Sequence, residues 1–209
     1  MKKGLIEQMV LGSVSTNTWL LENKDTKELL IVDPAAQADK IKDKILRMQA
    51  EPKAILLTHG HFDHMLAAAE LRDAYHIPIY VMTIEQRLME SPDYNLSALW
   101  AEPYVLTADE YLVEGSKLDL AGFHIQVLHT PGHTAGSCCY YIEEEKVLFS
   151  GDTLFAGSVG RTDFPTSNGT KMVSSLKRLL TELPEDTRVC PGHNDETTIG
   201  YEKRYYSFD

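Results

Sequence analysis

Residues 54–64 read Ala-Ile-Leu-Leu-Thr-His-Gly-His-Phe-Asp-His, an apolar run that ends in three histidines and an aspartate. The apolar side chains before the first histidine are typical of a buried strand. His59 and His61 are two residues apart in an extended segment and therefore point the same way, so that both can bind one metal ion. Asp63 and His64 lie where the chain should turn into a helix and point elsewhere, which suits a second ion. This stretch predicts a strand that presents metal ligands at its C-terminal end.

Three later apolar runs also end in turns, and each turn carries one further donor side chain: His133, Asp152 and His193. Two of these turns read Pro-Gly-His, in which glycine allows a tight turn and a close approach of the backbone. If the ends of the four strands share one edge of a sheet, seven nitrogen and oxygen donors converge there. Asp152 can then bridge two ions roughly 3.5–4 Å apart, because each of its oxygens can bind one of them. The pattern predicts a hydrolase with two metal ions.

The donor set also indicates which metals to expect. Zinc accepts neutral imidazole and carboxylate ligands and keeps one position open for water in catalytic sites. Zinc is therefore the expected metal, and iron and manganese are the alternatives that the same ligands accept. A single structural zinc would need four close ligands, which are often cysteines. Of the remaining histidines, His129 is expected to fix the backbone of its turn, and His76 and His124 are expected to lie in solvent.

The composition is typical of a globular protein and argues against two classes of partner. The 209 residues, 43% of them hydrophobic, allow one domain over residues 1–209. Thirty-one acidic and 20 basic residues give a net charge of −11, which repels nucleic acid. No apolar stretch approaches the roughly 20 residues of a membrane span. The three cysteines are expected to be small buried side chains, and their odd number favours a reducing cytoplasm. We therefore expect a cytoplasmic protein without nucleic-acid or membrane partners.

The apolar periodicity predicts two successive blocks of strands and helices. In the first block we expect strands at 5–11, 18–22, 29–33, 54–57 and 78–81, and helices at 38–48, 65–75 and 83–90. In the second block, strands recur as far as residue 150, and helices are expected at 171–182 and 199–205. Residues 91–110 are polar and aromatic and are left unassigned. Strands followed by helices, twice over, predict two packed sheets with helices outside.

The order of the donor residues resembles a known family. The motif Thr-His-x-His-x-Asp-His at 58–64, followed by His133, Asp152 and His193, resembles the metal-binding motif of the metallo-β-lactamase superfamily. The stretch Gly-Asp-Thr-Leu-Phe at 151–155 resembles its glyoxalase II-type thioesterases. This resemblance implies an α+β fold, the four-layer αβ/βα sandwich, with the metals at one edge of two packed sheets.

The resemblance also implies two sets of metal ligands joined by one bridging aspartate: His59, His61 and His133; Asp63, His64 and His193; and Asp152. The implied activity is hydrolysis of a small-molecule thioester or ester, in which a hydroxide between the metals attacks the carbonyl carbon. Asp63 and Asp152 are the expected catalytic residues. Asp63 is expected to hold the hydroxide through its free carboxylate oxygen.

Arg161 is the candidate substrate-binding residue. The Gly-Arg pair at 160–161 resembles glyoxalase II enzymes, which place a basic residue here against a carboxylate of the substrate. The alternative is that Arg161 pairs with Asp163 and braces the turn. Few residues follow His193, so we expect no separate C-terminal substrate domain of the kind with which full-length glyoxalase II enzymes bind glutathione. The chain most resembles the short, single-domain glyoxalase II-like proteins, and recognition of glutathione stays open.

Two other activities of the superfamily are alternatives. Persulfide dioxygenases share a Gly-Arg-Thr-Asp-Phe run, here at 160–164, and use one iron, which would bind His59, His133 and Asp152. Some members of the superfamily are lactonases. Family β-lactamases fit less well, because they carry cysteine or serine at the position of Asp152, and RNA-processing members fit poorly with the acidic charge. Iron content and oxygen uptake separate a dioxygenase from a hydrolase.

Overall fold

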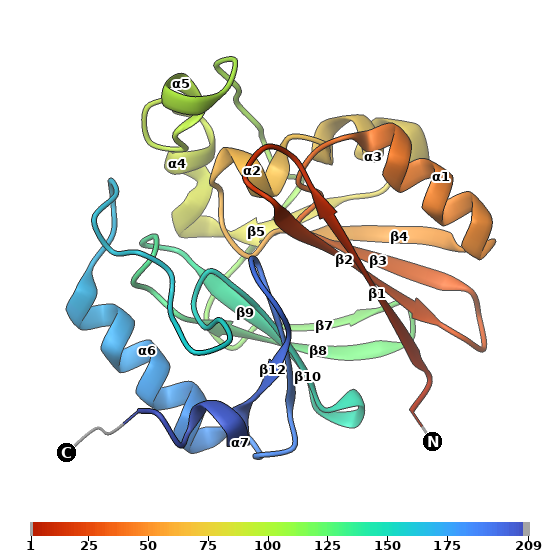
Figure 1. Cartoon of the computed structure of the whole chain (residues 1–209). Coiled ribbons are helices and arrows are strands. Elements are labelled where there is room, and N and C mark those ends of the chain that lie inside the picture. Colours follow the sequence, from red (N-terminus) through yellow and green to blue (C-terminus); the bar gives the residue numbers. More distant parts are fainter. Residues whose placement is uncertain (1, 207–209) are drawn as a thin grey trace.

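The strands form two mixed sheets that pack face to face (Figure 1). The computed structural model describes residues 2–206, and within them each sheet has six strands. In spatial order, the first sheet contains β1 (Gly4–Leu11), β2 (Thr16–Asn23), β3 (Glu28–Val32), β4 (Glu51–Leu56), β5 (Ile79–Met82) and β6 (Glu110–Leu112). The second contains β12 (Thr197–Thr198), β11 (Arg188–Pro191), β10 (Val147–Gly151), β9 (Cys138–Ile142), β8 (Phe123–His129) and β7 (Lys117–Leu120).

Helices cover the outer face of each sheet. On the side of the first sheet lie α1 (Ala38–Met48), α2 (Phe62–Met65), α3 (Ala68–Tyr75), the 3-10 turn η1 (Thr83–Glu85), α4 (Gln86–Met89) and α5 (Ser97–Trp100). In the second half of the chain come the 3-10 turn η2 (Glu143–Glu145), α6 (Gly169–Glu182) and α7 (Ile199–Glu202). Figure 1 shows α6 and α7 against the second sheet, which completes the expected four-layer αβ/βα sandwich. None of the helices among residues 2–206 is both long and apolar enough to cross a membrane.

Strand β3 shows why the core strands are continuous apolar runs. Leu29 and Ile31 pack with the helices on the outer face of the first sheet, in a cluster that includes Ile41 of α1. Leu30 and Val32 point the other way and pack between the two sheets. Because successive side chains of a strand alternate between its faces, a strand buried on both sides must be apolar at every position. The fold therefore has an outer core under each helix layer and a central core between the sheets.

Two helix predictions need correction. The single helix expected at 65–75 is wrong, because α2 starts earlier and a break separates it from α3. At this break the amide of Ala67 donates to the carbonyl of Pro34 at 3.0 Å, so the backbone bonds to a neighbouring loop instead of continuing one helix. The helix expected at 199–205 ends at Glu202. The unassigned segment 91–110 contains the short helix α5 and reaches the start of β6.

The four strands that precede the donor residues all end at the same edge of the sandwich. Strand β4 runs parallel to β3 and β5 in the first sheet. Strands β10 and β11 are parallel in the second sheet, and β8 runs in the same direction because both it and β10 are antiparallel to β9. The predicted convergence is therefore confirmed, and it takes place between two sheets rather than along one.

Candidate metal centre

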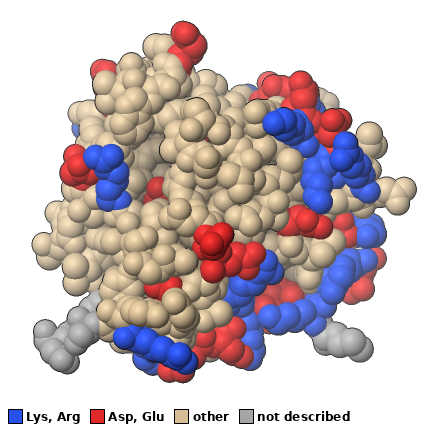
Figure 2. Space-filling view, in the orientation of Figure 1, with Lys and Arg blue, Asp and Glu red and all other residues tan. Residues whose placement is uncertain are grey.

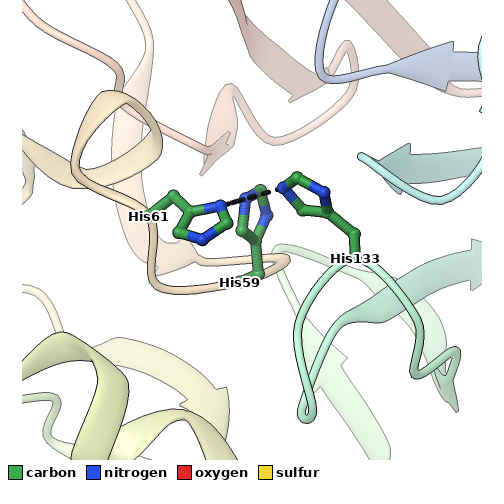
Figure 3. A group of neighbouring side chains, drawn as sticks. All are labelled: His59, His61 and His133. Carbon is green, nitrogen blue, oxygen red and sulfur yellow. Dashed lines mark hydrogen bonds between the residues drawn. The ribbon is translucent and has the colours of Figure 1, made fainter. Parts of the chain in front are cut away.

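The first group of donors consists of three buried histidines, His59, His61 and His133, here called the three-histidine group. Nδ1 of His61 lies 3.1 Å from Nε2 of His59 and 2.9 Å from Nε2 of His133. Figure 3 shows the three rings converging, two from the loop after β4 and one from the loop after β8. Three ring nitrogens that meet in this way can bind one metal ion together.

The second group consists of Asp63, His64 and His193, here called the Asp63 group. Oδ2 of Asp63 lies 3.5 Å from Nε2 of His64 and 3.4 Å from Nε2 of His193. The short helix α2 carries Asp63 and His64, whereas His193 lies in the turn after β11. His64 is fully buried, but Asp63 and His193 are partly exposed. The second group is therefore more open to solvent than the first.

Asp152 lies between the two groups. Its Oδ2 is 3.4 Å from Nε2 of His133 and 3.5 Å from Nε2 of His193, and its Oδ1 is 3.4 Å from Nε2 of His64. Gly192 makes this approach possible, because a Cβ at that position would lie only 2.2 Å from Oδ1 of Asp152. The structure thus brings together all seven residues that the sequence singles out. The carboxylate of Asp152 lies between the three-histidine group and the Asp63 group.

Buried polar atoms without partners test whether this cluster suits a metal. Nε2 of His61, Nε2 of His64 and Oδ1 of Asp152 are buried and have no hydrogen-bond partner within the described residues. A buried polar group without a partner is costly, so such atoms call for an explanation such as an ion. Nε2 of His64 and Oδ1 of Asp152 lie 3.4 Å apart inside the donor cluster, and both are donors that divalent metals accept, whereas the His61 atom that faces the cluster is Nδ1. The residues present therefore fit metal ions.

Hydrogen bonds behind the cluster orient two of the rings. Oδ2 of Asp33 accepts from Nδ1 of His64 at 2.9 Å and from Oγ1 of Thr58 at 2.6 Å. Oγ1 of Thr58 also lies 3.1 Å from Nδ1 of His59. Because the Thr58 hydroxyl donates its proton to Asp33, it accepts the hydrogen bond from His59. Because Nδ1 of each ring is bonded on the far side, Nε2 of each ring points into the cluster. Hydrogen bonds of this kind commonly orient metal-binding histidines.

The two groups differ in the pKa values of their histidines. Burial, together with the neighbouring histidines, holds the pKa values of His59 and His61 well below the ordinary histidine value. At neutral pH these imidazoles are neutral, and a neutral imidazole is the form that binds a metal.

The pKa of His64 shifts in the opposite direction. Burial lowers it, but the carboxylates of Asp63, Asp152 and Asp33 outweigh burial and raise the pKa of His64 to about 10. The pKa of His193 is also raised, because the hydrogen bond that its ring donates to Asp63 and the charge of Asp152 outweigh burial. The metal-free Asp63 group therefore holds protons that a metal ion would have to displace.

A pocket of about 490 Å³ opens over the cluster, and its walls are largely aromatic. The ring of Trp100 lies 5.6 Å from that of Phe164 and 6.5 Å from that of Phe62, and Phe155 contributes a further wall. Figure 2 shows acidic and basic side chains intermixed over the right and lower parts of the face in view, and a mostly uncharged surface at its centre and upper left. A small molecule with apolar groups fits such a pocket.

Arg161 lines this pocket but is already paired. Its guanidinium donates two hydrogen bonds of 2.7 Å to the carboxylate of Asp163 and lies over the ring of Phe164. Its backbone carbonyl accepts from Nδ1 of His133 at 2.8 Å. The side chain therefore braces the turn as the alternative prediction states, while the backbone supports the three-histidine group.

Three residues near the cluster were missed by sequence reasoning. Asp33 stands at the end of a buried strand, a position that could have drawn notice because the other donors also follow strands. Thr16, whose hydroxyl donates to Oδ2 of Asp63 at 2.6 Å, and Glu85, a fully buried carboxylate, carry no such signal. Their partners lie far away along the chain, so only the folded structure reveals them.

The remaining histidines and the cysteines lie as expected. Nε2 of His129 bonds to the carbonyl of Ala135 at 2.9 Å and so fixes the turn that carries His133. His76 and His124 are exposed. All three cysteines are buried thiols: Cys138, Cys139 and Cys190.

Comparison with known proteins gives one consistent result. The family model of the metallo-beta-lactamase superfamily matches residues 11–193. Hydroxyacylglutathione hydrolase GloC from Haemophilus influenzae is 35% identical over 88% of this chain and 88% of its own length. The crystal structure of BLEG-1 B3 metallo-beta-lactamase has a TM-score of 0.91 and 41% identity, covering 96% of this chain and 97% of that one. The structure of TTHA1623 in a di-iron-bound form has a TM-score of 0.84 and 38% identity, covering 95% and 97%.

The match spans the region from β1 to the turn that carries His193. It includes every residue of the two donor groups and Asp152. Members of this superfamily use such histidine and aspartate groups to bind divalent metals, and hydrolases are named among the similar proteins. The chain belongs to the metallo-beta-lactamase superfamily.

Proposed function

We propose that this chain is a dinuclear metallohydrolase that cleaves a thioester or ester bond in a small molecule, in the manner of glyoxalase II. The observation that carries the proposal is the position of Asp152, whose carboxylate is within 3.5 Å of donors from both groups. A carboxylate shared between two donor sets is typical of two-metal sites. The likeness to GloC and to a di-iron protein supports the same interpretation.

Each donor group would hold one ion, with zinc as the expected metal and iron or manganese as the alternatives. Such ions would supply the positive charge that lowers the pKa of water to near neutral and so makes it a nucleophile for a carbonyl carbon. Asp63 is the residue of this chain that would orient that nucleophile. Its carboxylate is fixed by the hydroxyl of Thr16 and lies at the partly exposed side of the cluster.

The pocket supports a small substrate with an apolar acyl or leaving group. Its walls include Phe62, Trp100 and Phe164, and its floor includes His61 and Asp152. The guanidinium of Arg161 is engaged with Asp163, so the charge that would hold an anionic substrate is largely neutralised. We therefore propose that apolar contacts contribute more to substrate binding than Arg161 does.

Elemental analysis of the purified chain, together with hydrolysis of S-D-lactoylglutathione, tests the proposal. Two metal ions per chain and rapid hydrolysis are the expected result. Two ions without this activity would keep the hydrolase class and direct the assay to other thioesters, lactones and, given the likeness to BLEG-1, a β-lactam. One iron per chain with oxygen uptake on a persulfide would replace the hydrolase with a dioxygenase.

A further inference from the structure

Glu85, at the end of η1, lies fully buried between the two loops that carry the three-histidine group. Its Oε2 accepts the amide of Gly60 at 2.8 Å. Its Oε1 accepts the amide of Gly136 at 2.7 Å and the hydroxyl of Thr134 at 2.9 Å. One carboxylate therefore satisfies three donors through both of its oxygens.

The two loops belong to different sheets. Gly60 stands between His59 and His61 after β4 of the first sheet, and Thr134 follows His133 after β8 of the second. The three histidine nitrogens lie within about hydrogen-bond distance only if these loops keep their spacing. Glu85 bonds both loops at positions next to the histidines, so it fixes that spacing.

The same carboxylate explains one of the two glycines in these loops. A Cβ on Gly136 would lie 2.7 Å from Oε1 of Glu85, and a Cβ on Gly60 would lie 2.4 Å from Met89 and 3.4 Å from Oε2 of Glu85. Real Cβ atoms do not approach other atoms to less than about 3 Å, so the backbone at residue 136 can reach the carboxylate only because a side chain is absent there. Gly136 thus serves the contact with Glu85, whereas Gly60 makes room for the side chain of Met89.

We propose that Glu85 is a positioning residue that holds the loop of His59 and His61 against the loop of His133, so that the three histidines form one metal-binding group. The inference rests on the proposed two-metal function and adds to it a residue outside the cluster. Burying a carboxylate is costly unless donors satisfy it, and charge-assisted hydrogen bonds are stronger than neutral ones. Burial raises the pKa of Glu85 above its ordinary value, and its three hydrogen bonds oppose that shift.

Glu85→Gln is the sharpest substitution because it keeps the size of the side chain. The amide of glutamine has one oxygen and one NH2 group, so one of the two loops would face a donor instead of an acceptor. The matched control is Glu145→Gln. Glu145 is also buried and accepts a backbone amide, that of Lys3, at 2.9 Å, but it lies before the start of β10, at the opposite end of that strand from Asp152.

Cobalt(II) titration of the metal-free proteins, followed by visible absorption, gives the stepwise affinities without any activity assay. For Glu85→Gln we expect one of the two affinities to fall about 10- to 100-fold, the range seen for residues that orient metal ligands, while Glu145→Gln keeps both. The loss should persist in a His193→Ala background, where the three-histidine group remains. It should be absent in a His61→Ala background, where that group is already broken.

Unchanged affinities in Glu85→Gln, or equal losses in both backgrounds, would overturn the inference and leave the two-metal proposal standing. A wild-type chain that binds no cobalt would overturn the proposed function itself. If Glu85→Gln fails to fold, as judged by circular dichroism, Thr134→Val replaces it. This variant removes one donor to Oε1, so a smaller loss in the same group is expected, and no loss there would count against the role of Glu85.

Discussion

The three-histidine group and the Asp63 group lie side by side, but the protein prepares them differently. The first is buried, and the pKa values of His59 and His61 are held well below the ordinary histidine value, so these two imidazoles are neutral at neutral pH. The second is partly exposed and combines a carboxylate with imidazoles whose pKa values are raised. His64 in particular carries an extra proton at neutral pH until a metal ion replaces it.

This difference shows that two donor groups with different chemistry can lie side by side at one edge of the same fold. The cause is the number of carboxylates around each group. Asp63, Asp152 and Asp33 all raise the pKa of His64, whereas burial and the neighbouring histidines lower that of His59. We therefore expect the three-histidine group to fill first at neutral pH and the Asp63 group to respond to pH. The predictions that follow test this contrast.

The largest effect is expected for Asp152→Ala, because the carboxylate oxygens of Asp152 lie within 3.5 Å of ring nitrogens of both groups. The substitution should lower kcat by more than about 100-fold, beyond the usual effect of residues that only orient ligands. It should also reduce the metal content from two ions to one. Steady-state kinetics and elemental analysis measure both effects.

Asp195→Ala is the control, because Asp195 is exposed and close by in the sequence. It should change neither quantity. An Asp152→Ala protein with two bound metals and full activity would show that the two groups act without a shared carboxylate.

The second prediction concerns pH. In the metal-free protein His64 has a pKa of about 10, above its ordinary value of 6.5, so its charged form stabilises the fold. This contribution is complete below about pH 6.5 and disappears as the pH rises towards 10. Metal binding to the Asp63 group should show the opposite trend, with an affinity that rises about tenfold per pH unit for each proton displaced.

Competition titrations with a chelator at pH 6.5, 7.5 and 8.5 measure this dependence. The three-histidine group should respond less over this range, because the imidazoles of His59 and His61 are already neutral. Equal pH dependence of the two ions would remove the contrast between the groups.

A third prediction uses the hydrogen bond behind His64. Asp33→Asn weakens the acceptor of His64 Nδ1 and removes one of the charges that raise its pKa. We expect the affinity of the Asp63 group to fall about 10- to 100-fold, as for other residues that orient metal-binding histidines. Isothermal titration of the metal-free protein measures it.

Asp109→Asn is the matched control, because Asp109 accepts a backbone amide at the start of β5 without contacting a histidine. If both variants weaken metal binding equally, the hydrogen bond to His64 has no special role.

The smallest effect is expected for Arg161→Gln. The guanidinium of Arg161 is exposed and paired with Asp163, and only its backbone supports the three-histidine group. Metal content should stay the same, and KM for an uncharged thioester should change by less than about threefold, as is usual for exposed ion pairs. A large rise in KM that is confined to anionic substrates would restore the prediction that Arg161 binds a substrate carboxylate.

The sequence by itself predicted two packed sheets with helices outside and singled out the seven donor side chains that the structure brings together. Apolar runs such as residues 54–57 are typical of buried strands, and donors placed at their ends meet where those ends meet. Local periodicity contains this information because it arises from the geometry of neighbouring residues. The break between α2 and α3 was not predictable in this way, since it depends on a hydrogen bond from Ala67 to Pro34.

Only the tertiary structure decided how the donors divide into two unlike groups and what holds them. The contacts of Asp33 with His64, and of Glu85 with both Gly60 and Gly136, join residues that are 25 to 51 positions apart. The pKa of His64 likewise depends on which carboxylates the fold brings around it. A sequence pattern records spacing along the chain, whereas these effects depend on distances in space and on burial, which exist only in the folded protein.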